Sequence, residues 1–218
     1  DGMIVINRKG TGKIALADPP NTPVRWTSIY NSITFNQFGT DFPLGGMNEQ
    51  GLVVEELSYS PSVYPSPDSF ATVNEMQWVQ YQLDTCSSVR EVIDTLSRIR
   101  MAKWLFGLHY LVSDKSGNAA VIEWIDGEVL CYTGDTLPVQ VLSNNRYENT
   151  LAYLYRHRGY GGDMLPVNDT GSQSRFVRAA MMLDRYDGAH PSSPTAYALS
   201  ILDSVQQSDT QWSIVYDP

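Results

Sequence analysis

Two polar residues stand where a folded chain could present them to a substrate. Asn144 lies in LSNNRYEN (142–149), at the end of a predicted strand, and Arg175 lies in GSQSRFVRAA (171–180), at the start of a predicted helix. An asparagine side chain donates two N–H bonds and suits an oxyanion hole, whereas an arginine can hold a carboxylate or polarise a thiol. Taken singly, a turn asparagine and a surface arginine are the simpler interpretations.

Other familiar catalytic patterns do not occur in the sequence. The patterns GxxxxGK[ST], GxSxG and HExxH are missing, and the three histidines are scattered. His109 lies in a predicted strand, where a packed or hydrogen-bonded histidine is the simpler interpretation. Cys86 and Cys131 have neither metal-ligand spacing nor a CxxC partner. We interpret both as structural thiols, and a disulfide between them stays open.

The stretch GGMNEQGLVVEELSYS (45–60) combines turn residues with a predicted strand over 52–59. Its glycines can adopt positive φ at little cost, which favours a turn ahead of the strand. These glycines are Gly45, Gly46 and Gly51. The strand carries Glu55 and Glu56. Because neighbouring strand residues point to opposite faces, we do not expect the two carboxylates to converge as a catalytic pair.

The composition fits one globular domain over residues 1–218 with a sizeable core. Hydrophobic residues make up 42% and charged residues 18% of the chain, and the net charge is −9. A chain this acidic is disfavoured as a partner of nucleic acids or of anionic membrane surfaces. No run of about 18 apolar residues occurs, so no transmembrane helix is predicted.

Hydrophobic periodicity predicts strands, a helix pair, a meander of strands and then further helices. The predicted strands cover 3–7, 26–38 (a strand or hairpin), 52–59, 108–113, 119–125, 128–133, 139–143 and 212–216. Predicted helices begin at capping boxes over 72–75 and 88–91, and others cover about 151–159, 173–186 and 194–206. Because strands and helices do not alternate as βαβ units, we expect an α+β fold with antiparallel sheets between helix layers.

Four motifs occur in a characteristic order and at characteristic separations. They are GMNEQGL (46–52), LHYLVSDKSGNAAVIEW (108–124), VLSNN (141–145) and SRF (174–176). This arrangement resembles the choloylglycine hydrolase family of linear-amide C–N hydrolases, which includes bile salt hydrolases and penicillin V acylases. The resemblance implies an N-terminal nucleophile (Ntn) hydrolase, an αββα sandwich that acts on small N-acyl amides such as conjugated bile salts or penicillin V. It implies no metal or organic cofactor and, since the family often forms homotetramers, a homo-oligomer. The location, cytoplasm or periplasm of a bacterium, stays open.

The resemblance assigns roles to three residues of this chain. Asn144 matches the family's oxyanion-hole or substrate-orienting asparagine, and Arg175 matches its active-site arginine. Ser58 falls at the second oxyanion position, where family members usually have Asn or Tyr. A serine can still donate there through its hydroxyl or its backbone N–H. The loops 60–70 and 159–172 are expected to form rims of the substrate pocket.

The family's nucleophile has no match in the sequence. The resemblance implies a cysteine at the mature N-terminus, whose own α-amino group shuttles the proton, followed by an Arg and an Asp ahead of the first strand. Cys86 and Cys131 do not match it. We therefore expect the chain to be a piece of a longer hydrolase, incomplete at both ends and inactive by itself. Two alternatives stay open: a non-catalytic homologue that binds small amphipathic ligands, and an α+β domain without a pocket function.

Overall fold

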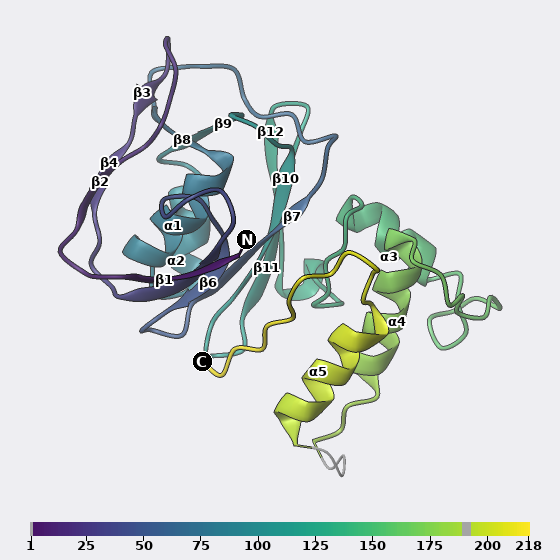
Figure 1. The fold of residues 1–218 in the computed structure, drawn as a ribbon. Coiled ribbons are helices and arrows are strands. Elements are labelled where there is room, and N and C mark those ends of the chain that lie inside the picture. The colour runs from purple at the N-terminus through teal and green to yellow at the C-terminus, as the bar shows by residue number, and fades with distance from the viewer. Residues whose placement is uncertain (1, 189–192) are drawn as a thin grey trace. The chain divides into compact units, whose positions relative to one another are not determined.

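The computed structural model describes residues 2–188 and 193–218. Contacts divide the chain into two compact units, one made of residues 1–138 with Pro218 and one of residues 139–217. The first unit holds the sheets, and the second consists of helices and loops (Figure 1). A single domain over residues 1–218 stays a prediction.

An antiparallel sheet of seven strands forms the centre of the first unit (Figure 1). Its strand order is β1-β5-β6-β7-β10-β11-β12. These strands are β1 (Met3–Asn7), β5 (Ser32–Asn36), β6 (Pro43–Asn48), β7 (Val53–Ser58), β10 (Leu108–Ser113), β11 (Ala119–Ile125) and β12 (Glu128–Thr133). The strands predicted over 3–7, 52–59 and the later meander are therefore confirmed.

Close packing, rather than turn geometry, accounts for two of the glycines in the GGMNEQG stretch. A Cβ atom on Gly45 would meet the Glu55 carboxylate, and a Cβ atom on Gly46 would meet the backbone carbonyl oxygen of Ile33. Both glycines lie inside β6. Gly51 takes a φ of 80° just before β7. The predicted turn is therefore confirmed at Gly51, whereas no turn occurs at the other two.

Helices α1 (Glu75–Thr85) and α2 (Val89–Thr95) pack against one face of this sheet (Figure 1). Buried residues of α1, such as Trp78 and Leu83, share one core with buried sheet residues such as Tyr110. Hydrophobic burial of this kind is the main force that fixes the helices on the sheet.

The two helices begin at different kinds of cap. The Asn74 side chain caps α1 by accepting bonds from the backbone N–H groups of Met76 and Gln77. The capping box predicted over 72–75 is therefore wrong, because Asn74 is the N-cap and the helix begins at its neighbour. Ser88 caps α2 as predicted and accepts from the Glu91 N–H.

Short strands complete the first unit. β2 (Gly12–Ile14) pairs with β4 (Arg25–Thr27), so the strand or hairpin predicted over 26–38 divides between β4 and β5. The strands β3 (Thr22–Pro23), β8 (Ala71–Asn74) and β9 (Arg100–Ala102) form a parallel sheet. A 3-10 turn, η1 (Gly134–Thr136), follows β12.

The second unit is built on α3 (Tyr147–Leu154), α4 (Ser172–Asp184) and α5 (Pro194–Ser204). α4 packs against α3 through the rings of Phe176 and Tyr147, whose centroids lie 6.2 Å apart. α5 is fixed to α4 by the Tyr197 hydroxyl, which donates to the carbonyl oxygen of Met182 at 2.6 Å. The helices predicted over 173–186 and 194–206 are confirmed, whereas the helix predicted over about 151–159 begins and ends earlier, at Tyr147 and Leu154.

Two strands predicted in the second unit are wrong. Residues 139–143 and 212–216 belong to no strand. The Val139 backbone N–H donates to the Tyr147 hydroxyl, and that hydroxyl donates to the Val139 carbonyl oxygen at 2.7 Å. The backbone polar groups of Val139 are thus satisfied by a side chain of α3 rather than by a neighbouring strand.

Candidate active site

The second unit brings two of the predicted site residues into contact. The Arg175 side chain reaches from the first turn of α4, and its Nη2 donates to the Asn144 Oδ1 at 2.8 Å. The two residues are 31 positions apart in the sequence. Folding of the second unit therefore assembles this pair, which neither motif contains by itself.

The contact fixes which end of the Asn144 side chain faces Arg175. A guanidinium carries only donors, so the carboxamide must turn its oxygen toward Arg175. The Nδ2 group, with its two N–H donors, is then directed away from the guanidinium. An amide held in this way is an oriented donor, which is the property that stabilisation of an oxyanion requires.

Further bonds hold both partners. Arg175 Nε donates to the carbonyl oxygen of Thr170 at 3.1 Å, so the guanidinium is anchored at two points. Ser172, at the start of α4, donates to the hydroxyl of the buried Ser143 at 3.0 Å. The residue before Asn144 is thus tied to the same helix turn that presents Arg175.

The surroundings of Arg175 lower its pKa, but the side chain stays positively charged. Burial, followed by the nearby positive charge of Arg178, lowers the pKa of Arg175, whereas Asp209 opposes this shift. A guanidinium still remains protonated in proteins. Arg175 therefore acts as a fixed cation and not as an acid or base.

Ser58 belongs to the first unit, so the pair Asn144–Arg175 is the part of the predicted site that the structure brings together. Ser58 is the last residue of β7, is exposed, and is paired with Leu108 of β10. The next residue, Tyr59, donates its backbone N–H to the carbonyl oxygen of Gly107 at 2.7 Å. The loop before β10 therefore runs beside the end of β7.

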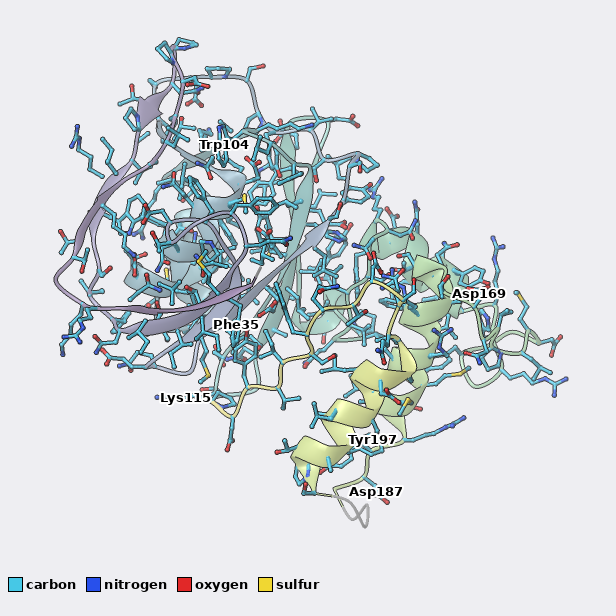
Figure 2. All side chains as sticks on the ribbon, viewed as in Figure 1. Phe35, Trp104, Lys115, Asp169, Asp187 and Tyr197 are labelled. Carbon is cyan, nitrogen blue, oxygen red and sulfur yellow. The ribbon has the colours of Figure 1, made fainter. Side chains whose placement is uncertain are left out.

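That loop carries apolar side chains that the sequence interpretation did not single out. Leu105 and Phe106 are both exposed, and Phe106 packs against the exposed Phe38 with ring centroids 5.5 Å apart. The buried carboxylate of Glu75 accepts bonds from the backbone N–H groups of Trp104, Leu105 and Phe106, at 2.6 to 2.7 Å. Figure 2 labels Trp104 on this loop. The cluster KWLFG in the sequence was the available signal.

The neighbouring carboxylates of β7 point to opposite faces, as predicted. The Glu55 side chain lies over Gly45, whereas Glu56 faces the same side as the buried Val54. Although Glu56 as a residue is only half-buried, its Oε2 is enclosed and has no hydrogen-bond partner among the described residues. Burial first, and then the charges of Glu75 and Glu55, raise the pKa of Glu56 well above its ordinary value.

Neither cysteine has the properties of an activated nucleophile. Both are free thiols, so no disulfide joins them. Cys86 is buried, and burial raises its pKa to about 11, while Cys131 is half-buried and burial raises its pKa as well. Because the thiolate is the reactive form, these shifts lower the reactive fraction of both thiols at neutral pH.

His109 is a packed residue, as predicted. Its Nδ1 lies 2.9 Å from the Glu123 Oε1, both side chains are fully buried, and its ring stacks on Tyr59.

Within the described ranges, no group of three or more His, Cys, Asp or Glu side chains could hold a metal ion. Nor does that part of the chain include a helix with the length and apolar character needed to span a membrane.

Comparison with known proteins gives the relationship of this chain. The model of the family described as "Linear amide C-N hydrolases, choloylglycine hydrolase family" matches residues 34–211. The chain is similar to the penicillin V acylase of Pectobacterium atrosepticum, with 30% identity over 173 residues that make up 72% of this chain and 46% of that protein. The chain thus spans about half the length of this curated relative.

Two solved structures share the fold. The penicillin V acylase of Agrobacterium tumefaciens is 27% identical with a TM-score of 0.82, and the match covers 97% of this chain and 66% of that one. A mutant of the conjugated bile acid hydrolase of Clostridium perfringens is 18% identical with a TM-score of 0.77, over 97% and 74% of the two chains. The predicted Ntn-hydrolase-like α+β fold is therefore confirmed. The chain belongs to the choloylglycine hydrolase family of linear-amide C–N hydrolases.

Proposed function

We propose that the protein carrying these residues hydrolyses the linear C–N bond of a small N-acyl amide. The observation that carries the proposal is the bond from Arg175 Nη2 to Asn144 Oδ1, because it orients the amide donors of Asn144. An oriented donor stabilises the negative charge that develops on the amide oxygen during attack. Family membership supplies the reaction class.

The nucleophile in this proposal is an N-terminal cysteine that precedes Asp1. The shifted pKa values of Cys86 and Cys131 support this assignment, because neither thiol is activated. The α-amino group of the N-terminal cysteine takes the thiol proton, and the sulfur forms a bond to the amide carbon. The oxyanion accepts bonds from Asn144 Nδ2. Collapse breaks the C–N bond, the amine leaves with the proton, and water then hydrolyses the thioester and restores the thiol.

An apolar acyl group fits the surface features of the first unit. Leu105, Phe106 and Phe38 expose apolar side chains beside the end of β7, where Ser58 lies. Exposed apolar side chains that cluster in this way are typical of binding surfaces. Membership of the family, and not the geometry of the first unit, is the ground on which we propose Ser58 as a second donor to the oxyanion. Penicillin V and glycine-conjugated bile salts, the substrates suggested by the names of one relative and of the family, are the compounds to test first.

Turnover by the complete protein tests the proposal. We expect release of the amine from at least one of these compounds and no release after the N-terminal cysteine is replaced by alanine. The 218-residue chain alone should be inactive. Tight binding of the compounds without turnover would instead support a non-catalytic ligand-binding homologue. If the protein neither binds nor hydrolyses the compounds, the result would support an α+β domain without this pocket function.

A further inference from the structure

A second arginine on α4, Arg178, donates hydrogen bonds to backbone carbonyl oxygens in two segments of the second unit. Its Nη1 donates to the carbonyl oxygens of Val167 at 3.0 Å and Asp169 at 2.8 Å, and its Nε donates to that of Ser204 at 3.0 Å. Asp169 is labelled in Figure 2 on the loop ahead of α4. Ser204 ends α5, so this bond lies at the negative end of a helix dipole. One side chain thus ties a loop and the end of α5 to α4.

The loop held by Arg178 is also a partner of Arg175. Thr170, whose carbonyl oxygen accepts from Arg175 Nε, directly follows Asp169, whose carbonyl oxygen accepts from Arg178. The two arginines are three residues apart and therefore neighbours on the helix surface. Loss of the Arg178 bonds would release the backbone that anchors the guanidinium of Arg175.

Charge adds to this mechanical link. Burial first, and then the positive charge of Arg178, lower the pKa of Arg175. Like charges repel, so conformations of Arg175 that turn toward Arg178 are disfavoured. The Arg175 Nη2 group donates to Asn144 Oδ1 in the observed conformation.

We propose that Arg178 is a positioning residue for the Asn144–Arg175 pair. It holds the loop that anchors Arg175 and thereby keeps the amide donors of Asn144 in one direction. Its role in turnover rests on the proposed function. Because the three bonds that tie Arg178 to the loop and to α5 all end on backbone carbonyls, it need not touch substrate.

The activity test uses Arg178→Met in the complete protein, because methionine keeps an unbranched stem and removes every donor. We expect kcat to fall about 10- to 100-fold with KM changed less than about twofold, as for a misplaced catalytic group. Arg185→Met is the matched control, since it removes the same charge from an exposed residue at the end of the same helix, and kcat should not change. Arg178→Lys keeps the charge but cannot reach the three carbonyls at once, so it should restore little of the activity.

A double variant separates positioning from a general loss of structure. In an Arg175→Lys background, adding Arg178→Met should lower kcat less than about twofold, because the group to be positioned is already altered. The same loss in both backgrounds would overturn the proposal, and so would full activity of Arg178→Met.

Hydrogen exchange gives a readout that does not need turnover. In the complete protein, Arg178→Met should speed amide exchange about tenfold in residues 143–150, around Asn144, and Arg185→Met should not. If the wild-type protein hydrolyses no amide, the proposed function fails while this measurement still decides the role of Arg178. Unchanged exchange around Asn144 would overturn that role, whatever the activity.

Discussion

Replacing Asn144 by aspartate should separate catalysis from stability. Aspartate has the same shape, and its carboxylate can accept the bond that Arg175 Nη2 now donates to Asn144 at 2.8 Å. A partly exposed ion pair contributes about 0 to 1 kcal/mol, so the exchange at the Arg175 contact should change the free energy of unfolding by no more than about that amount. The two N–H donors are lost, however, and a negative charge takes their place. Loss of one oxyanion donor costs about 2.7–4 kcal/mol in the transition state, or about 10²- to 10³-fold in kcat.

The assay is steady-state amine release by the complete protein, with thermal unfolding measured on the same samples. Asn144→Leu is the companion variant. It removes the donors but also leaves Arg175 without its Asn144 acceptor, so it should lose both activity and about 1–3 kcal/mol of stability. An Asn144→Asp variant that keeps its kcat would refute the oxyanion role. An Asn144→Asp variant less stable than Asn144→Leu would refute the assigned geometry of the pair, because only aspartate keeps an acceptor for Arg175.

Three further predictions concern the first unit. Glu75→Gln should lower the free energy of unfolding by about 2–4 kcal/mol in urea titrations, because a carboxamide oxygen cannot replace a carboxylate that accepts three backbone N–H bonds. An unchanged midpoint of the urea unfolding transition would contradict this prediction. Glu56→Gln should raise the melting temperature at neutral pH but not at pH 4. The pKa of Glu56 is raised on folding, so the protein has its full stability below the unfolded-state pKa and loses stability as the pH rises toward the folded-state pKa. A gain in melting temperature that does not depend on pH would contradict this prediction. Iodoacetamide should label Cys86 far more slowly than a small-molecule thiol at pH 7.5, and the labelling rate should still rise above pH 9, because the pKa of Cys86 in the folded chain is about 11. Mass spectrometry of the peptide measures the labelling. Rapid labelling at neutral pH would contradict the burial of Cys86.

Local patterns predicted those elements whose stability is also local. The meander β10–β12 and the cap at Ser88 depend on alternation, short turns and one side chain, all of which can be seen in a few consecutive residues. The strand predicted over 139–143 does not form. At its first residue, the Val139 backbone N–H and carbonyl oxygen are both hydrogen-bonded to the Tyr147 hydroxyl and not to a neighbouring strand.

The contacts that build the candidate site join residues far apart in sequence. Asn144 and Arg175 are 31 residues apart, and the Glu75 carboxylate binds N–H groups 29 to 31 residues away. No periodicity encodes such contacts. The local pattern places Glu75 in a capping box because helix starts favour an acidic residue there, yet its carboxylate organises a distant loop. The resemblance to a family, and not the local pattern, is what singled out Asn144 and Arg175 together.

The most direct test of the central claim is to trap the acyl-enzyme. The complete protein would be mixed with excess penicillin V or a glycine-conjugated bile salt, quenched in acid within one turnover, and digested for mass spectrometry. The account predicts an added acyl mass on an N-terminal cysteine and none on Cys86 or Cys131, with the adduct depleted by Asn144→Asp. An acyl group on Cys86 or Cys131, or turnover by the 218-residue chain alone, would contradict it.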